Sequence, residues 1–290
     1  MNNTKTTYKS FSAGLSLRRR LCYLFLILLT LFCLVPFYIL IINATRTHSQ
    51  IQVGFSAVPG TNFLKNFVNV WKSTDNMNVQ RALLNSLIVS GLAAAFTTYF
   101  SAMTAFGLYM YRFKFRKFAF NFIMLVMMVP SQVSALGFIK LMRTFGFMDS
   151  FVPLVIPSIA SPVVFFYMFQ YMESTLPHAM VESARIDGAN EFYSFNVIVL
   201  PIMKPAMAVQ AIFSFVSSWN NYFMPALIIK SRNNKTIPLL IAELRSADYL
   251  KFDLGKVYML ICIAIVPLII VYFFLSKYII GGVTAGSVKG

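Results

Sequence analysis

The sequence is short of charged residues, and above all of acidic ones. Charged residues make up 12% of its 290 residues, and only nine of them are Asp or Glu. A typical soluble domain carries about 25% charged residues, whereas here 58% of the chain is hydrophobic. Because so little polar surface cannot cover a globule in water, the composition excludes a soluble protein and places the chain in a lipid bilayer.

Cysteine and histidine are scarce as well, with three and two residues. Cys22, Cys33 and Cys262 each lie within an apolar run, without the spacing of a metal site or of a disulfide framework. The two histidines are too far apart in the sequence to indicate a metal or catalytic pair. We therefore expect no metal site and no nucleophile–base arrangement, and hence no enzyme.

The phosphate-binding loop G-x4-G-K-[ST] is missing from the sequence. Residues 281–289 contain several glycines, but Ser287 stands where that loop requires lysine. We therefore expect this chain to bind no cofactor, and any ATP hydrolysis to take place on a separate chain.

Positive charge, by contrast, is abundant and lies beside the apolar segments. Lys and Arg number 25, which gives a net charge of +16. Arg18, Arg19 and Arg20 precede the first apolar segment, and a second basic cluster at residues 112–117 follows the next one. Such clusters are retained on the cytoplasmic side of a membrane. They form no face or repeat suited to nucleic acid, so nucleic acid is excluded as a partner.

Six apolar segments are long enough to cross a bilayer as helices. About 20 apolar residues are needed, because each residue rises about 1.5 Å and the hydrocarbon is roughly 30 Å thick. The segments are residues 21–42, 82–111, 118–139, 150–172, 205–229 and 257–276, all without Asp, Glu, Lys or Arg. The sequence thus predicts an all-α membrane protein with six transmembrane helices. Pro130 in the third segment and the prolines at 153, 157 and 162 in the fourth should bend those helices.

The basic clusters predict a cytoplasmic N-terminus and, with six spans, a cytoplasmic C-terminus. The expected organisation is a cytoplasmic segment 1–20, a transmembrane domain 21–276 and a cytoplasmic tail 277–290, which its glycines make flexible. The first span, at about 22 residues, exceeds the roughly 7–15 of a cleaved signal peptide, and no small-x-small site follows it. The loop 230–256 is basic although this topology places it outside, but long loops count less than short flanks.

One polar stretch, residues 178–201, separates the fourth and fifth apolar segments on the cytoplasmic side. Residues 179–187 are expected to form a short helix with a charged edge at Glu182 and Arg185. Gly188 then permits a sharp change of direction, since glycine adopts backbone angles that other residues avoid. The polar stretch is therefore predicted to be a helix–turn–helix elbow.

The second half of this elbow is predicted to be apolar on one side. Phe192, Phe195 and Val199 share a stripe at roughly helical spacing. Leu200-Pro201 is expected to end this helix, because proline disfavours helix at the residue before it. The elbow's other surface is acidic and built of small residues, which suits a protein partner better than anionic lipid headgroups.

The elbow resembles the EAA loop of ABC importer permeases. The motif is carried by Glu182, Ser183, Ala184, Gly188, Ile198, Leu200 and Pro201, with Ser183 in place of the usual alanine. Residues 185–189, 200–206 and 218–220 are similar to the carbohydrate-importing branch. The tail 282–290 is similar to that of the smaller permease subunit of maltose-type systems. The resemblance covers roughly residues 82–290.

The resemblance implies a fold, a set of partners and a mechanism. It implies the type I ABC importer permease fold in a prokaryotic plasma membrane, paired with a second, homologous permease subunit as a heterodimer. It further implies two ATPase subunits that bind ATP and Mg²⁺, an extracellular solute-binding protein, and a sugar or oligosaccharide as substrate. In the family the elbow is the coupling helix that docks into a cleft on an ATPase subunit.

The resemblance also assigns roles to residues of this chain. Those that couple to the ATPase are expected to be Glu182, Ser183, Ala184, Arg185, Asp187, Gly188, Leu200 and Pro201. In the tail, Gly286 and Lys289 would belong to a segment inserted between the ATPase subunits. The alternative for the tail is an ordinary disordered end.

Polar side chains within the spans are candidates for the substrate pathway, because burying them is costly without a partner. The candidates are Asn85, Ser131, Gln132, Gln170, Gln210, Asn220 and Asn221. The run Trp219-Asn220-Asn221-Tyr222 offers both amide groups and aromatic faces to a sugar. Hydrogen bonding between helices explains the same residues equally well. An ion-coupled secondary transporter of small polar solutes is the alternative function, but such proteins commonly carry ionisable residues within their spans.

Overall fold

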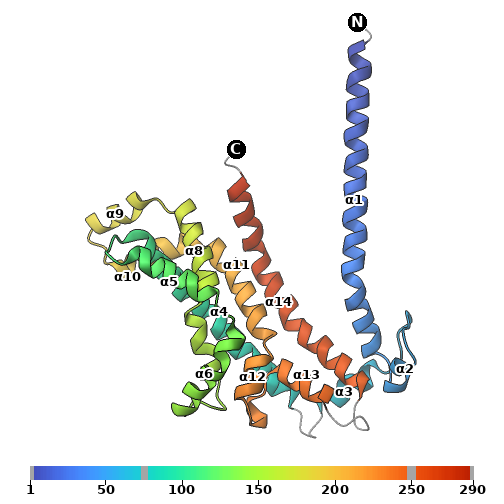
Figure 1. The fold of residues 1–290 in the computed structure, drawn as a ribbon. Coiled ribbons are helices and arrows are strands. Elements are labelled where there is room, and N and C mark those ends of the chain that lie inside the picture. The colour runs from blue at the N-terminus through green and yellow to red at the C-terminus, as the bar shows by residue number, and fades with distance from the viewer. Residues whose placement is uncertain (1–2, 73–77, 247–252, 288–290) are drawn as a thin grey trace. The chain divides into compact units, whose positions relative to one another are not determined.

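The computed structural model describes residues 3–72, 78–246 and 253–287, and these form helices and no strand (Figure 1). The chain divides into two compact units. The N-terminal unit is Met1–Asn69 with Asp253–Cys262, and the core unit is Val70–Phe252 with Ile263–Gly290. All the candidate sites from 82 to 229 lie in the core unit.

The N-terminal unit contains the first long helix and a polar turn after it. Its elements are α1 (Asn3–Ala44), α2 (His48–Gln52), most of α3 (Phe63–Trp71) and the start of α14 (Leu254–Ser287). Beyond the end of α1, the buried Arg46 guanidinium donates to Asn43 Oδ1 at 3.1 Å and to the carbonyl of Gly54 at 2.9 Å. The Asn66 amide donates to the carbonyl of Arg46 at 2.9 Å. The polar groups at the end of α1 are thus paired within the chain.

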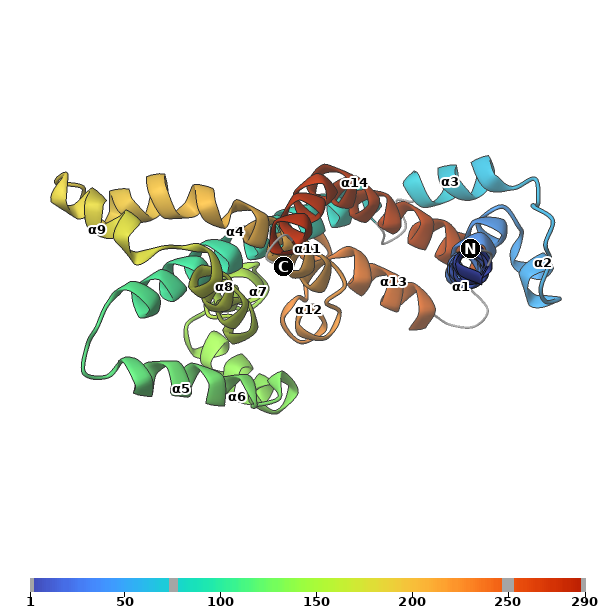
Figure 2. The same cartoon turned by 90° about the horizontal axis from the view of Figure 1, so that it is seen from above.

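The core unit is built around one long helix, α4 (Val79–Met110), which packs against α8 (Pro162–Thr175) and α11 (Leu200–Trp219) (Figures 1 and 2). Small side chains on α4 are buried and permit close approach of the neighbouring helices. Larger apolar side chains fill the space between the three helices. They include Phe106, Phe165, Met168, Phe195 and Met203, all buried.

The third expected span is broken into two helices. These are α5 (Arg116–Met127) and α6 (Ser131–Thr144), and their axes differ in direction by 99°. Pro130 stands directly before α6 and cannot donate a backbone hydrogen bond to continue α5. The expected bend at Pro130 is confirmed, and it divides this segment into two separate helices.

The fourth span is also interrupted, as its prolines predict. It consists of α7 (Val152–Val155), the 3-10 turn η1 (Ile156–Ile159) and α8. Pro162 has no N–H to give to the carbonyl of Ser158, four residues earlier. The Thr97 hydroxyl of α4 donates to that carbonyl instead, at 2.9 Å. A neighbouring helix therefore satisfies the group that the proline leaves free.

The fifth span differs most from expectation, since helical backbone continues through Leu200 and Pro201. The short helix α10 (Glu191–Tyr193) leads into a π-helical turn, η2 (Ser194–Val199), and then into α11. In the π turn the Leu200 N–H donates to the carbonyl of Phe195, five residues back. Because this wider pairing shifts the hydrogen-bond register, the missing N–H of Pro201 does not end the helix. The expected helix end at Leu200-Pro201 is therefore wrong.

The same span ends earlier than expected at its other end. The sequence favoured helix to residue 229, but α11 stops at Trp219 and a separate helix, α12 (Phe223–Ile228), follows. The turn η3 (Arg232–Asn234) and α13 (Ile237–Ser246) complete this end of the unit. The Asn85 amide of α4 donates to the carbonyls of Asn233 and Lys235 at 2.8 and 2.9 Å. Asn85 therefore ties this segment to α4.

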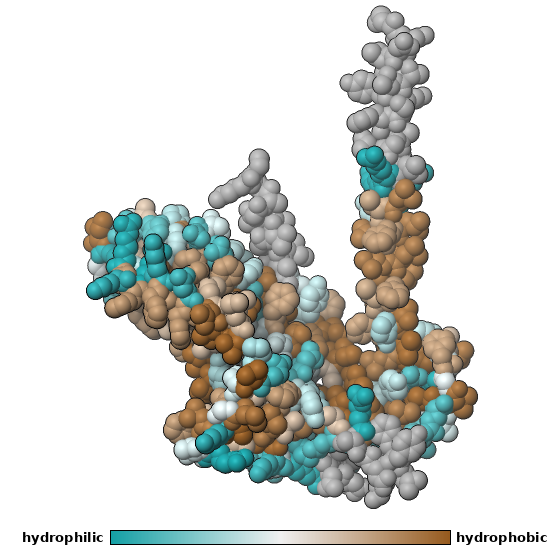
Figure 3. All heavy atoms as spheres, viewed as in Figure 1, coloured by the Kyte–Doolittle hydropathy of each residue, from teal (hydrophilic) through white to brown (hydrophobic). Residues whose placement is uncertain are grey.

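By length and composition, five helical stretches of the described chain can cross a membrane, and six if the bent α5–α6 pair counts as one span. The five are Arg18–Ala44, Val79–Met110, Val152–Thr175, Glu191–Trp219 and Leu254–Ser276. On the face in Figure 3, hydrophilic side chains gather around α9 (His178–Ile186) at one end of the core unit and around α6 at the other. The surface between them is largely hydrophobic, as a membrane-crossing unit requires.

The last helix extends into the expected tail. The backbone of α14 remains helical as far as Ser287, so helix continues into the segment that its glycines led us to expect to be flexible. Gly286 lies in the last turn of this helix. Lys289 lies outside the described residues.

Candidate functional site

The elbow consists of a short helix, a glycine turn and a second, capped helix start. The first helix, α9, ends at Ile186, and Gly188 has a φ of +86°, a left-handed conformation that favours glycine. The Asn190 side chain then accepts a hydrogen bond from the Tyr193 N–H at 2.8 Å and so caps α10. The predicted helix and the turn at Gly188 are confirmed.

An ion pair braces the elbow across its turn. Arg185 Nε and Nη2 donate to the two carboxylate oxygens of Glu191 at 2.7 and 3.2 Å. The same guanidinium lies 5.2 Å from the ring centre of Tyr111, the residue that ends α4. The hydrogen bond that Arg185 donates to Glu191 is the main reason that the pKa of Arg185 is raised. The ion pair fixes α9 relative to α10, and the ring contact fixes both to α4.

The ion pair between Arg185 and Glu191 changes the role expected for the charged edge formed by Glu182 and Arg185. Glu182 is exposed, but Arg185 is only part-exposed and its charge is used within the chain. Sequence reasoning missed Glu191 and Tyr111 as its partners. The one available signal was the six-residue separation of opposite charges around a glycine turn.

The outer face of α9 presents a mixture of polar and apolar side chains. Glu182, Ser183 and Asp187 are exposed, and Ile186 is exposed to 85%. An apolar side chain this exposed, on the polar stretch of the chain, is the kind of group that a protein partner covers. Sequence reasoning missed Ile186, because it stands between two charged residues and belongs to no apolar stripe.

One motif residue of the elbow, Ala184, faces the chain's own interior. The Ala184 side chain is buried, next to the fully buried Val181 on the same helix. The backbone of Ala184 accepts a hydrogen bond from the Ala189 N–H at 2.9 Å. The small side chain of Ala184 therefore lets α9 lie close to the rest of this subunit, and its methyl group is not on the exposed face.

The predicted apolar stripe of the second half is only partly buried. Phe195 and Val199 are buried in the core with Met203, but Phe192 is 70% exposed. Leu200 is part-buried and Pro201 is exposed. The π turn explains the difference, since it changes the angular spacing between Phe192 and the residues that follow.

The predicted pathway residues are divided between a core and a helix junction. Trp219 is buried and stacks on Phe215, with ring centres 5.6 Å apart, so its indole face is covered within the subunit. Asn220 and Tyr222 are exposed after the end of α11, and Asn221 Oδ1 accepts the Met224 N–H at 3.3 Å. Asn220, Asn221 and Tyr222 thus form the junction between α11 and α12, and Asn221 bonds to the first turn of α12.

Gln132 lies apart from this junction. It is exposed in the first turn of α6, where Ser131 Oγ donates to its Oε1 at 3.3 Å. Gln132 does not line the cavity that contains Asn221. The structure therefore does not bring all the pathway candidates together.

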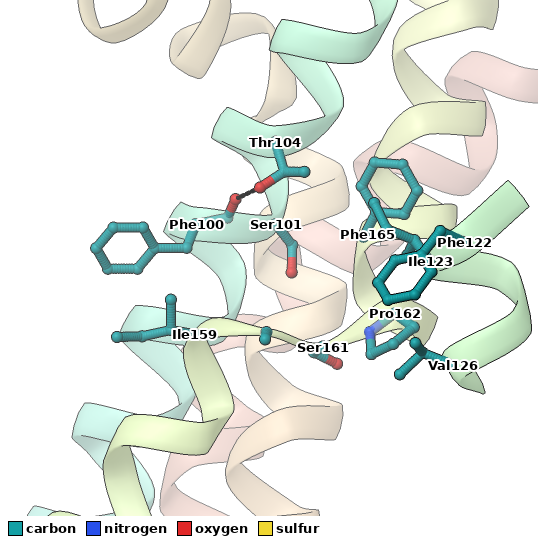
Figure 4. A pocket seen from close by; sticks show the side chains of 11 residues that line it. Phe100, Ser101, Thr104, Phe122, Ile123, Val126, Ile159, Ser161, Pro162 and Phe165 are labelled. Atoms are coloured by element: carbon teal, nitrogen blue, oxygen red, sulfur yellow. Dashed lines mark hydrogen bonds between the residues drawn. The ribbon is translucent and has the colours of Figure 1, made fainter. Parts of the chain in front are cut away.

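Two cavities flank the break between η1 and α8. One, of about 330 Å³, is apolar and lies between α4, α5 and the break (Figure 4). Phe122 and Phe165 line it, together with the buried Ser101, whose hydroxyl has no hydrogen-bond partner among the described residues. The other, of about 520 Å³, lies between α4, α11 and the break and is lined by polar as well as apolar side chains. Asn221 lines this polar cavity.

Comparison with known proteins defines the family of the chain. A family described as "Binding-protein-dependent transport system inner membrane component" matches residues 97–283. The arabinooligosaccharides transport system permease protein AraQ of Bacillus subtilis (strain 168) is 33% identical over 273 residues, 92% of this chain and 94% of that protein. The lactose transport system permease protein LacG of Rhizobium radiobacter is 30% identical over 278 residues, 94% of this chain and 99% of that protein.

A solved structure shares the fold. It is a crystal structure of a bacterial ABC transporter involved in the import of the acidic polysaccharide alginate. The similarity has a TM-score of 0.75 at 20% identity and covers 90% of this chain and 96% of that chain. The arrangement of broken and continuous spans described above is therefore that of an ABC importer permease.

The helical core, the elbow and these similarities together define a membrane-embedded subunit of an ABC transporter. The chain belongs to the family of binding-protein-dependent transport system inner membrane components. It is a multi-pass permease subunit of the bacterial inner membrane, a component of a binding-protein-dependent ABC transporter, and such subunits are not enzymes. The family resemblance drawn from the sequence is confirmed.

Proposed function

We propose that this permease couples ATP hydrolysis on separate ATPase subunits to sugar transport, and that the elbow is the point of coupling. One observation supports the proposal: the outer face of the elbow is exposed, while an ion pair within the chain holds its two helices together. Ile186 and Glu182 are exposed, while the Arg185–Glu191 pair ties α9 to α10. A rigid projection with an uncovered apolar side chain transmits movement of a docked partner into the spans.

The proposed role of each elbow residue follows from its position. Glu182, Ser183 and Asp187 form the contact surface around Ile186, since all are exposed. Gly188 makes the turn, and Arg185 holds it. Ala184 seats α9 on this subunit, and Leu200 and Pro201 lie where the elbow continues into α11.

The proposed assembly contains a second, homologous permease subunit, two ATPase subunits and the binding protein. ATP and Mg²⁺ would be held by the ATPase subunits, in accord with the missing phosphate loop in this sequence. In this assembly the end of α14, including Gly286, and Lys289 beyond it would insert between the ATPase subunits.

The proposed substrate is a sugar or oligosaccharide. AraQ and LacG belong to systems named for arabinooligosaccharides and lactose, and the polar cavity beside Asn221 offers hydrogen-bonding groups. We further propose that both termini and the elbow are cytoplasmic, with segments 1–20 and 277–290 flanking the transmembrane domain 21–276. Basic residues flanking the spans support this orientation.

The docking role can be tested by placing a charge on the elbow's apolar contact. Ile186→Asp should reduce co-purification of the ATPase subunits with the tagged permease, and with it sugar uptake. The control is Phe147→Asp, a similar change at an exposed apolar residue between α6 and α7. If Ile186→Asp retains the ATPase subunits and normal uptake, the elbow is not the docking surface.

A further inference from the structure

The polar side chains that line the polar cavity all carry hydroxyl or amide groups. It lies between α4, the break before α8, and the last turns of α11. Its polar lining residues are Thr97, Ser158, Ser161, Gln210, Ser214, Ser217, Ser218 and Asn221. No charged side chain lines it, and its volume is about 520 Å³. The cavity therefore has many groups that form neutral hydrogen bonds and none that neutralises a charge.

Gln210 is the most informative of these residues. It belongs to α11, is only 8% exposed, and lines the cavity. In the part of the chain that the structure describes, its amide forms no hydrogen bond. The amide atoms are accessible from the cavity rather than sealed in the core. A largely buried side chain that presents an unpaired amide to a cavity indicates a partner that enters from the cavity.

The position of the cavity agrees with this interpretation. It adjoins the break at Ala160 and Ser161, and Asn221 at its edge belongs to the break between α11 and α12. In membrane transporters, interrupted helices mark the place where polar groups line a pathway rather than face lipid. Lipid is an unsuitable occupant, because hydrocarbon offers no hydrogen bond to the Gln210 amide or to the serine hydroxyls of α11.

The apolar cavity on the other side of the break provides a contrast. Phe100, Phe122 and Phe165 line it, and its polar groups are few (Figure 4). Thr104 Oγ1 already donates to the carbonyl of Phe100 at 2.8 Å. A solute with many hydroxyl groups therefore fits the cavity at Gln210 and not the one at Ser101.

We propose that the polar cavity is a contact site of this subunit for the translocated solute, and that the solute segment bound there is an uncharged, hydroxyl-rich sugar unit. The Gln210 amide donates to one sugar hydroxyl and accepts from another, and the serines at 214, 217 and 218 contact further hydroxyls. An anionic sugar is disfavoured, because it would enter without a cation or helix dipole to neutralise it. This inference rests on the proposed sugar transport and adds the charge class of the substrate and the residue that contacts it.

The first arm of the test asks whether the cavity faces water, and it does not depend on transport. In the assembled complex, with Cys22, Cys33 and Cys262 replaced by serine, Ser217→Cys is treated with a charged methanethiosulfonate reagent. It should react at least about tenfold faster than Phe273→Cys, because the exposed Phe273 lines no described cavity and faces lipid. Equal, slow reaction of both thiols would overturn the proposal, since the cavity would then be closed by lipid or by another subunit.

The second arm measures transport by the complete complex with its binding protein, using labelled arabinotriose, lactose and an alginate trisaccharide as probes. Gln210→Leu should lower kcat/KM for the neutral probe that the wild-type complex transports by about tenfold, the loss expected for a hydrogen bond worth about 1.4 kcal/mol. Assembly of the complex should be unchanged. The control is Thr98→Val, because the buried Thr98 hydroxyl bonds the Ala94 carbonyl of its own helix and lines no described cavity.

The outcomes separate this inference from the proposed function. Normal uptake by Gln210→Leu, or an equal loss in Thr98→Val, would overturn the contact at Gln210 while leaving sugar transport intact. Loss of assembly in Gln210→Leu would identify the cavity as an interface between subunits and overturn the site. Transport of the alginate probe alone would overturn the uncharged substrate class, and transport of none of the three sugars would contradict the proposed function itself.

Discussion

The Asp149 carboxylate accepts a hydrogen bond from the backbone N–H of Ser231, 82 residues later in the chain, at 2.9 Å. The same oxygen accepts the Lys230 N–H at 2.9 Å, and the Asn234 amide donates to the Asp149 carbonyl at 2.6 Å. Asp149 has a φ of +58°, which is unusual for a residue other than glycine. One aspartate thus joins the turn between α6 and α7 to the turn between α12 and α13.

Removing this carboxylate should destabilise the end of the core unit that is remote from the elbow. Asp149→Ala leaves the Ser231 and Lys230 N–H groups without their acceptor. It also places alanine, which has no polar side-chain atom, at a positive φ. We expect a loss of roughly 1–2 kcal/mol, seen as a lower midpoint of thermal unfolding for the purified complex.

The matched control is Asp149→Asn, which keeps an acceptor oxygen and tolerates the left-handed backbone. It should unfold at a midpoint between those of the wild type and the alanine variant. Burial alone would raise the pKa of Asp149, but the N–H groups of Ser231 and Lys230 hold it below its ordinary value of 3.8. The stabilisation is therefore present above about pH 4 and is lost as the pH falls through the lowered pKa. An alanine variant with unchanged stability at pH 7 would contradict this assignment.

Transport by Gly188 variants should depend on whether the new residue tolerates a positive φ, and not on the size of its side chain. A β-carbon there would meet no atom within 4 Å in this subunit, so the constraint is the φ of +86°. Gly188→Val imposes a cost of roughly 1–2 kcal/mol on that conformation and should abolish uptake with normal membrane abundance. Gly188→Asn tolerates the turn and should retain transport. Loss of uptake in both variants would instead show that the partner requires the absence of a side chain.

The Arg185–Glu191 pair should affect coupling more than assembly. Arg185→Ala frees the turn from α10 and from the Tyr111 ring, so elbow movement is transmitted less completely. Both side chains are partly exposed, and a pair of this kind is worth roughly 0.2–1 kcal/mol. We therefore expect uptake per ATP hydrolysed to fall by up to about fivefold. The exchanged pair Arg185→Glu with Glu191→Arg should recover part of the loss, and equal defects in single and double variants would exclude a direct interaction.

The end of the chain should contribute to coupling as well. Deletion of residues 285–290 removes Gly286 from the last turn of α14 and Lys289 beyond it. If this segment inserts between the ATPase subunits, sugar-stimulated ATP hydrolysis by the purified complex should fall while the ATPase subunits remain bound. Unchanged stimulation in an intact complex would show that the end of the chain has no coupling role.

Local sequence signals predicted much of this structure, and non-local contacts account for most of the remainder. The positions of the spans followed from apolar length, the breaks before α6 and α8 from Pro130 and Pro162, and the elbow turn from Gly188. The π turn was not predictable from Leu200-Pro201 alone, because it depends on the hydrogen-bond register of the preceding turn.

The candidate site was less predictable for the same reason. Burial of Ala184 and the stacking of Trp219 on Phe215 depend on helices that are distant in sequence. The unpaired state of the Gln210 amide likewise becomes visible only when the neighbouring helices are in place. Residue type identified these positions as unusual, but their roles required the packing.

The π turn at Ser194–Val199 also determines how the elbow is oriented around the axis of α11. Successive residues of an α-helix are about 100° apart around the axis, so one additional residue in a turn rotates everything on its far side by about that angle. Deleting a single residue between 194 and 199 would convert the turn to α-helix. It would rotate α9, with Ile186, by about a quarter-turn around the axis of α11. Sequence changes in this turn thus act as an angular adjustment of the docking face, and relatives that differ there in length would present the same elbow residues in a different direction.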